Sequence, residues 1–180
     1  PIKYYEPKGS AQVKSSVMLA ALNTPGTTKI VAHKSRDHTE ILFKYLKIPI
    51  KIKKTKKLSF IEIEGKNNIK SFSYNISSDI SSSAFFIVLT LLSKKSSLTV
   101  KNVNINPSRA GSINILNKMG AKIIFRNKKE YKGEKIADIY VKSAKSLKAI
   151  KCPTKYNSSA IDEFLIIFLV AAKSKGISFF

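Results

Sequence analysis

Cysteine and histidine are nearly absent from this chain, which has one cysteine and two histidines among 180 residues. The lone Cys152 cannot form an internal disulfide, and so few thiol and imidazole groups leave no ligand set for a transition metal. We therefore expect no metal. Such scarce cysteine is typical of a reducing compartment, and we expect a cytoplasmic protein.

Long apolar runs and nucleotide-binding loops are also missing. The longest apolar run, residues 164–172, is far shorter than the roughly 20 residues that cross a bilayer, so we expect no membrane span. The seven glycines form neither of the common glycine-rich loops that hold ATP or NAD. This pattern argues against a nucleotide-dependent enzyme.

Acidic residues are scarce as well: 11 stand against 33 basic ones, which gives a net charge of +22. Such a charge favours anionic partners, namely nucleic acid, anionic lipid or phosphorylated small molecules. Only Arg36, Arg109 and Arg126 are arginines, whereas nucleic-acid readers depend on arginine for bidentate contacts. We favour a solvated lysine surface that attracts small anions, and keep a lysine-rich nucleic-acid-binding module as an alternative.

The chain does contain an internal repeat, in a composition of 43% hydrophobic residues that is typical of globular proteins. The order helix, strand, helix, strand, strand starts at Ser10, returns at Ser81, and begins again near Ser159, at spacings of 71 and 78 residues. The predicted elements are helix 10–23, strand 28–32, helix 36–46, strands 50–54 and 58–64, then helix 82–93, strand 97–103, helix 108–119, and strands 121–126 and 136–142. With a preceding strand, each unit is βαβαββ, which predicts an α/β (α+β) fold.

Periodicity within these elements predicts which faces are buried. The first helix carries Val13, Val17, Ala20 and Ala21 at helical spacing, and residues 61 and 63 of one strand alternate with acids. Helices should therefore cover one face of each sheet. The polar stretch 66–78, with the Asn67-Asn68 pair, predicts a boundary between domains 1–74 and 75–180.

Two helix starts carry polar side chains that could do chemistry. Ser10 is a good N-cap after Gly9, and a helix start favours anions, so Gln12 could donate to a phosphate or simply face solvent. Arg36 has the same ambiguity, because it could bind an anion or pair with Glu40 four residues on.

The acids Asp162 and Glu163 precede the apolar run. Acids in a first helical turn are expected from the helix dipole alone, but a carboxylate in a cleft could also act as a base. Asp79, before the second repeat, reads as a structural cap.

Together, these motifs resemble the 3-phosphoshikimate 1-carboxyvinyltransferases, or EPSP synthases, in their glyphosate-tolerant bacterial type. The resemblance extends in order over essentially the whole chain, and no single motif would suffice. Its residues are Ser10-Ala11-Gln12-Val13-Lys14-Ser15, Asn23-Thr24-Pro25-Gly26, Arg36-Asp37-His38-Thr39-Glu40, Asp79 with Ser81-Ser82, Asn106-Pro107 with Arg109 and Gly111, Met119-Gly120-Ala121, and Ile161-Asp162-Glu163.

The resemblance implies an inside-out α/β barrel of two domains, each built from βαβαββ units. Residues 1–74 would be the last unit of one domain, and residues 75–180 a full unit plus the start of the next in the other. The implied reaction moves the carboxyvinyl group of phosphoenolpyruvate to the 5-hydroxyl of shikimate 3-phosphate and releases phosphate. It uses no metal or organic cofactor, and we expect a monomer with these two small-molecule partners, no nucleic acid and no membrane.

The resemblance also implies residue roles. Ser10 and Ala11 match contacts to shikimate 3-phosphate, Gln12 a contact to both substrates, and Arg36 a partner of the shikimate phosphate. Asp162 matches the general base that deprotonates the 5-hydroxyl.

Some parts of the family pattern fall outside this chain. Three parts of the family pattern have no counterpart here: the early lysine-serine and arginine motif, the glycine-rich phosphoenolpyruvate loop and the late basic segment. We therefore expect a fragment that is inactive alone. A UDP-N-acetylglucosamine carboxyvinyltransferase-like enzyme shares the implied fold and stays an alternative, as does a nonfunctional remnant.

Overall fold

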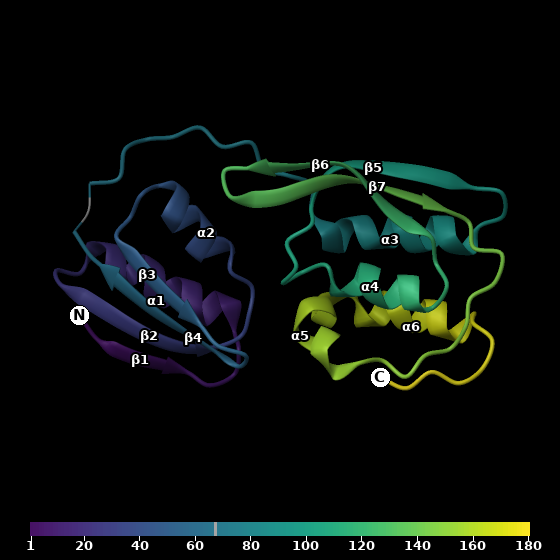
Figure 1. The fold of residues 1–180 in the computed structure, drawn as a ribbon, viewed down its shortest axis with the longest axis horizontal. Coiled ribbons are helices and arrows are strands. Elements are labelled where there is room, and N and C mark those ends of the chain that lie inside the picture. Colours follow the sequence, from purple (N-terminus) through teal and green to yellow (C-terminus); the bar gives the residue numbers. More distant parts are fainter. Residues whose placement is uncertain (67) are drawn as a thin grey trace. The chain divides into compact units, whose positions relative to one another are not determined.

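The structure is a computed structural model that describes residues 1–66 and 68–180. These residues divide into two compact units, 1–74 and 75–180, which are described separately below (Figure 1). Asn67 of the predicted linker lies outside the described residues. None of the helices in the described ranges is long and apolar enough to cross a bilayer.

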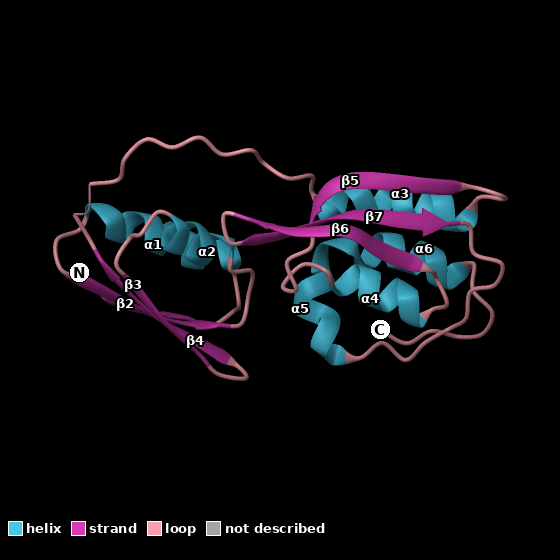
Figure 2. Ribbon diagram, turned by 45° about the horizontal axis from the view of Figure 1, so that its top comes forward, coloured by secondary structure: helices cyan, strands magenta, loops and turns pink. Residues whose placement is uncertain are grey.

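The first unit is one βαβαββ repeat, as predicted. Its sheet has the order β1-β2-β4-β3, with β1 parallel to β2 and the other pairs antiparallel. Both helices lie on the same face of this sheet (Figure 2). The elements are β1 (Lys3–Glu6), α1 (Ala11–Asn23), β2 (Thr27–His33), α2 (His38–Tyr45), β3 (Ile50–Lys54) and β4 (Leu58–Glu64).

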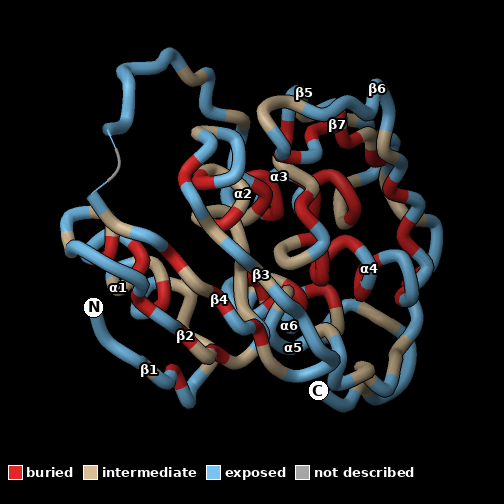
Figure 3. Tube along the Cα trace, turned by 60° about the vertical axis from the view of Figure 1, so that its left-hand side comes forward, coloured by how far each residue is buried: buried red, intermediate tan, exposed pale blue. Residues whose placement is uncertain are grey.

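Burial in this unit follows the predicted strand alternation. Ile61 and Ile63 of β4 are fully buried, and Ile61 pairs with the buried Ile30 of β2. Intermediate and exposed positions alternate with the buried ones along β4, and Figure 3 shows the burial of each segment by colour. The prediction for α1 is only partly right, because Ala21 is buried and Val17 packs against the core, but Val13 and Ala20 are exposed. Its buried residues include Lys14 and Met18, whereas Val13 is 41% exposed. The helix is thus rotated from its predicted orientation, and a lysine faces the core.

The second unit has a three-stranded antiparallel sheet of order β5-β7-β6. Helix α3 lies directly beneath it, with α4 and α6 beyond (Figure 1). The elements are α3 (Ile80–Leu92), β5 (Ser97–Asn104), α4 (Gly111–Lys118), β6 (Ile123–Tyr131), β7 (Glu134–Lys142), the 3-10 turn η1 (Thr154–Tyr156), α5 (Asn157–Ala160), the 3-10 turn η2 (Ile161–Glu163) and α6 (Phe164–Ala172).

Isolated bridges complete the repeat pattern in this unit. Ser78 pairs in parallel with Val103, at the place of the strand that should precede α3. Parallel bridges from Lys148 to Lys175 and from Lys151 to Phe179 then flank the helices between them. A strand-like segment therefore lies before α5 and another after α6.

Several predicted boundaries are wrong. Helix α3 begins at Ile80 instead of residue 82, α4 at Gly111 instead of residue 108, and strands β6 and β7 begin at Ile123 and Glu134 instead of residues 121 and 136. The second helix begins at His38 and not at Arg36, because Asp37 has non-helical backbone angles of φ −122° and ψ 24° and serves as its N-cap. Strand β6 continues beyond Arg126 to Tyr131, through an irregularity in its pairing with β7. The lysine-rich sequence there has no apolar alternation, so only pairing with β7 identifies it as a strand.

Gly111 explains how closely the start of α4 approaches α5. A Cβ at this position would lie 2.7 Å from the carbonyl carbon of Ser159 and 2.8 Å from its oxygen, and would also overlap its Oγ. Contacts this short with backbone atoms cannot be relieved by a side-chain rotation. Only glycine allows this approach.

We expect Gly111→Ala to lower the free energy of unfolding of this unit by about 1–3 kcal/mol, as overpacking does. Urea denaturation followed by circular dichroism measures the loss. The double variant Gly111→Ala with Ser159→Ala should be equally destabilised, since the obstacle is mainly backbone. Recovery in the double variant would show that the hydroxyl alone caused the clash.

Candidate functional site

The start of α1 presents free backbone donors beside a polar side chain. Ser10 is the N-cap: its Oγ accepts from Val13 N at 3.2 Å, and its carbonyl accepts from Lys14 N at 3.1 Å. Of the first four N–H groups of α1, those of Ala11 and Gln12 thus remain for an acceptor outside the helix. The exposed Gln12 side chain follows directly, so this end of α1 suits an anion.

The turn before α1 is held by a residue that sequence reasoning missed. Glu6 ends β1 and is 2% exposed, and its carboxylate accepts from Lys8 N at 2.9 Å and from Gly9 N at 2.6 Å. Gly9 adopts φ +72°, in the left-handed region that glycine tolerates without strain. Strand β1 thereby sets where the cap residue Ser10 lies.

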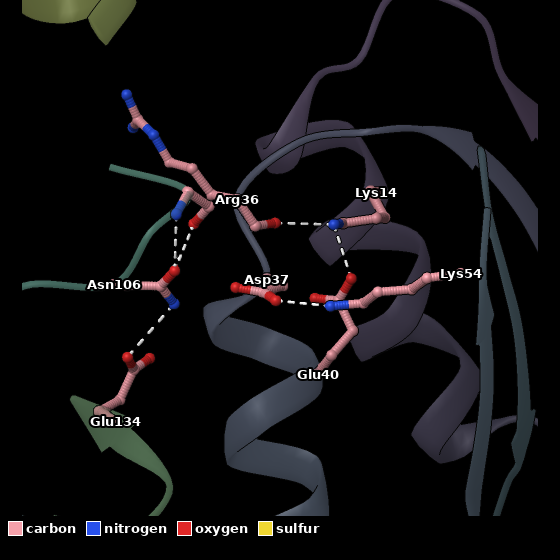
Figure 4. A network of polar contacts seen from close by, with 8 residues as sticks. Lys14, Arg36, Asp37, Glu40, Lys54, Asn106 and Glu134 are labelled. Atoms are coloured by element: carbon pink, nitrogen blue, oxygen red, sulfur yellow. Dashed lines mark hydrogen bonds and ion pairs between the residues drawn. The ribbon is translucent and has the colours of Figure 1, made fainter. Parts of the chain in front are cut away.

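Arg36 lies beside the first turn of α1, and Lys14 connects the two. Lys14 Nζ donates to the carbonyl oxygen of Arg36 at 2.7 Å and pairs with Glu40 Oε1 at 2.6 Å. Figure 4 shows both contacts, with the Arg36 guanidinium pointing away from the ion pair. Glu40 therefore pairs with Lys14, and the Arg36 side chain is directed elsewhere.

The ion pair between Lys14 and Glu40 is almost fully buried, with side-chain exposures of 1% and 3%. Burying two charges costs several kcal/mol per ion, at least partly offset by their mutual attraction and by the hydrogen bond to the Arg36 carbonyl. Such a pair has few alternative arrangements. It therefore fixes the backbone of Arg36 relative to α1.

Two further contacts hold the start of α2. Ser15 Oγ of α1 lies 2.7 Å from Thr39 Oγ1, and Lys54 Nζ of β3 lies 2.6 Å from Asp37 Oδ2. These contacts tie the start of α2 to both α1 and the sheet. The α1/α2 cluster is defined as Ser10, Ala11, Gln12, Lys14, Arg36 and Glu40. It combines helix N–H groups, an amide and a guanidinium, which together can bind a phosphorylated anion.

A second cluster lies in the other unit, where α3 begins. Asp79 caps α3 as predicted: its Oδ2 accepts from Ser82 N at 2.8 Å. Arg109 Nη2 lies 2.9 Å from Asp79 Oδ1. Burial opposes the ionisation of Asp79, but the hydrogen bonds from Ser82 and the charge of Arg109 together outweigh it and lower the pKa of this carboxyl. The cap is therefore charged at neutral pH.

Asp162 and Glu163 lie in the 3-10 turn η2, just before α6, so they precede that helix as predicted. Asp162 is exposed, whereas Glu163 is 4% exposed and accepts a hydrogen bond from Ser81 Oγ. The two neighbouring acids thus differ in their surroundings. Asp162 can reach a ligand, and Glu163 is part of the fold.

The turn before α4 is organised by Asn106. Its Oδ1 accepts from Ser108 N at 2.9 Å and from Ser108 Oγ at 2.8 Å, and its Nδ2 donates to Glu134 Oε2 at 3.4 Å (Figure 4). Arg109 is the next residue after Ser108, so this turn fixes the backbone from which the Arg109 side chain extends. The α3/α4/η2 cluster comprises Asp79, Ser81, Arg109, Asp162 and Glu163.

The structure places Ser10, Ala11, Gln12 and Arg36 in the first unit, with Arg36 tied to α1 through Lys14, and places Asp162 in the second. Sequence reasoning missed the supporting residues, of which Lys14 is the clearest. Its signal is visible in retrospect: with Met18 and Ala21 it forms an i, i+4, i+7 pattern. Because a lysine is rarely buried, such a pattern does not by itself predict that Lys14 faces the core.

Comparison with known proteins gives one consistent family. The family model described as EPSP synthase (3-phosphoshikimate 1-carboxyvinyltransferase) matches residues 1–179. The 3-phosphoshikimate 1-carboxyvinyltransferase of Zymomonas mobilis is 40% identical over 177 residues, which are 98% of this chain and 39% of the relative. That of Petrotoga mobilis is 40% identical over 178 residues, 98% of this chain and 40% of the relative.

Solved structures agree with this result. The EPSP synthase from Acinetobacter baumannii matches with a TM-score of 0.85 and 35% identity, over 98% of this chain and 40% of its own. The enolpyruvyl transferase NikO from Streptomyces tendae matches with a TM-score of 0.58 at 14% identity, over 84% of this chain and 37% of its own, which shows a shared fold alone. The chain spans about 40% of the length of the curated relatives named above.

Proposed function

This chain belongs to the EPSP synthase family, and from that premise we propose that it supplies part of an enzyme that transfers the carboxyvinyl group of phosphoenolpyruvate to shikimate 3-phosphate. The products are 5-enolpyruvylshikimate 3-phosphate and phosphate. One observation carries the proposal: the buried Lys14 of α1 donates to the Arg36 carbonyl and so ties the Arg36 backbone to the helix whose start carries the N–H groups of Ala11 and Gln12. This grouping suits a phosphorylated substrate.

The residue roles belong to the same proposal. Ser10, Ala11 and Arg36 bind shikimate 3-phosphate, and Gln12 contacts both substrates. Asp162 holds the 5-hydroxyl and takes its proton as the oxygen bonds to C2 of phosphoenolpyruvate, while C3 gains a proton and a tetrahedral adduct forms. In the elimination that follows, C3 loses a proton and the C2–O bond to phosphate breaks, which restores the double bond and releases phosphate. A carboxylate suits this task because it accepts a proton and stays exposed for the substrate.

We further propose that residues 1–74 are the last βαβαββ unit of one domain, and that residues 75–180 are one full unit plus the start of the next in the other. The enzyme acts in the cytoplasm as a monomer on its two small-molecule substrates, with no nucleic acid or membrane partner and no cofactor. The lysine-rich surface supports attraction of these anionic substrates. The 180 residues alone should be inactive.

A hybrid enzyme tests the function. It is the Zymomonas mobilis relative with its matching 177-residue segment replaced by this chain. We expect phosphate release that requires both phosphoenolpyruvate and shikimate 3-phosphate, with the unmodified relative as control. A hybrid that folds, by circular dichroism and sedimentation, yet releases no phosphate would overturn the proposal.

A further inference from the structure

We propose that Ser81, Arg109 and Glu163 form a positioning relay that fixes the turn carrying Asp162. The catalytic part of this inference rests on the proposed function, because it concerns the residue assigned there as the base. The relay itself does not touch substrate. Its role is to hold the backbone of η2 in one place.

Ser81 is the centre of the relay. Its Oγ donates to a carboxylate oxygen of Glu163 and accepts from Arg109 Nη2 at 2.6 Å. A hydroxyl can donate one hydrogen bond while accepting another, so Ser81 can satisfy an anion and a cation together. Each bond has a charged partner, and such bonds are about twice as strong as neutral ones.

The relay joins the starts of three helical segments. Ser81 lies in the first turn of α3, Arg109 precedes α4, and Glu163 ends η2 just before α6. Arg109 also pairs with the α3 cap Asp79 at 2.9 Å. These contacts link residues up to 82 positions apart in the chain. Displacing any one of them would shift the η2 turn relative to α3.

The burial of Glu163 makes its hydrogen bonds in the relay necessary. Glu163 is 4% exposed, and a buried carboxylate is costly unless hydrogen bonds satisfy it. Asp162 is the preceding residue of the same three-residue turn, yet it is exposed. Fixing the side chain of Glu163 therefore also restrains the backbone of Asp162. A base must be held close to its productive geometry, because a 1 Å displacement can cost about 10²-fold in rate.

The competing explanation is that Ser81 only stabilises the helix start. Ser93, at the other end of α3, offers a matched control, because its Oγ donates to the Leu89 carbonyl at 2.7 Å. Ser93→Ala removes one hydroxyl hydrogen bond within this helix, whereas Ser81→Ala removes two, both to charged side chains of other segments. A purely structural role predicts similar behaviour of Ser81→Ala and Ser93→Ala, whereas the relay predicts different behaviour.

The first experiment measures kinetics in the hybrid enzyme. Ser81→Ala and Glu163→Ala should lower kcat by about 10–100-fold, as expected for a displaced base, with KM for phosphoenolpyruvate nearly unchanged. Glu163→Gln keeps an oxygen that accepts from Ser81 and should recover most of the rate. Ser93→Ala should behave as the unmodified hybrid. A wild-type kcat in Ser81→Ala, or no recovery in Glu163→Gln, would overturn the relay.

The second experiment does not depend on activity. Amide hydrogen exchange in the 180-residue chain should become about tenfold faster or more across residues 161–167 in Ser81→Ala and Glu163→Ala, and stay unchanged there in Ser93→Ala. Equal exchange in both serine variants would refute the relay. Faster exchange with an inactive unmodified hybrid would retain the relay and reject the proposed function.

Discussion

Asp162→Asn should lower kcat of the hybrid enzyme by roughly 10²–10⁴-fold, the usual contribution of a general base. Asparagine keeps the shape of the side chain but cannot accept the proton of the attacking hydroxyl. Asp162 is exposed, so the free energy of unfolding should change by less than about 0.5 kcal/mol. Steady-state phosphate release and urea denaturation measure the two effects.

Glu130→Gln is the matched control for this prediction. Glu130 is also an exposed acid of the second unit, but it lies in β6 and is not a member of the α3/α4/η2 cluster. Its replacement removes the same charge and should leave kcat unchanged. If Asp162→Asn retained near-normal turnover, the role of Asp162 as base would have to be abandoned, even with an active hybrid.

Lys14→Met should have the largest effect on stability, lowering the free energy of unfolding of the first unit by about 3–5 kcal/mol. Methionine fills a similar volume but leaves Glu40, which is 2% exposed, buried without its cation. It also removes the donor to the Arg36 carbonyl. Urea denaturation of the 180-residue chain, followed through the amide NMR signals of residues 1–74, measures the loss.

A double variant separates charge from volume in this prediction. Lys14→Met with Glu40→Met replaces the whole pair by apolar side chains and should recover most of the stability, because the penalty comes from the unpaired charge. Lys29→Met is the surface control: Lys29 pairs with Glu62 at 3.0 Å, and this ion pair is open to solvent. It should change stability little. Equal losses in Lys14→Met and Lys29→Met would contradict the importance of burial.

The element order of this chain could be predicted because its signals are local. Apolar alternation in residues 58–64 identifies a strand with one buried face, and Asp79 shows where α3 begins. Ile113, Leu116 and Met119 lie at helical spacing, and all three are buried. In each case the neighbouring residues alone carry the pattern, so no knowledge of distant contacts was needed.

The segments whose position could not be predicted depend on pairing across the chain. Strand β1 is a four-residue segment that forms only because it aligns in parallel with β2. The second half of β6 is polar and is recognised only by its partner β7. Neither segment has the apolar periodicity by which a strand is recognised, since hydrogen bonds to a neighbouring strand define it.

The sequence by itself determined the repeat, the mixed α/β class and the ordered motifs that indicate the family, because these depend on residue order and local periodicity. Only the tertiary structure decided that Lys14 is buried and that Glu163 joins Ser81 while Asp162 stays exposed. The physical reason is that a charge can be buried only beside its partner. Those partners, Glu40 and Ser81, lie 26 and 82 residues away in the chain.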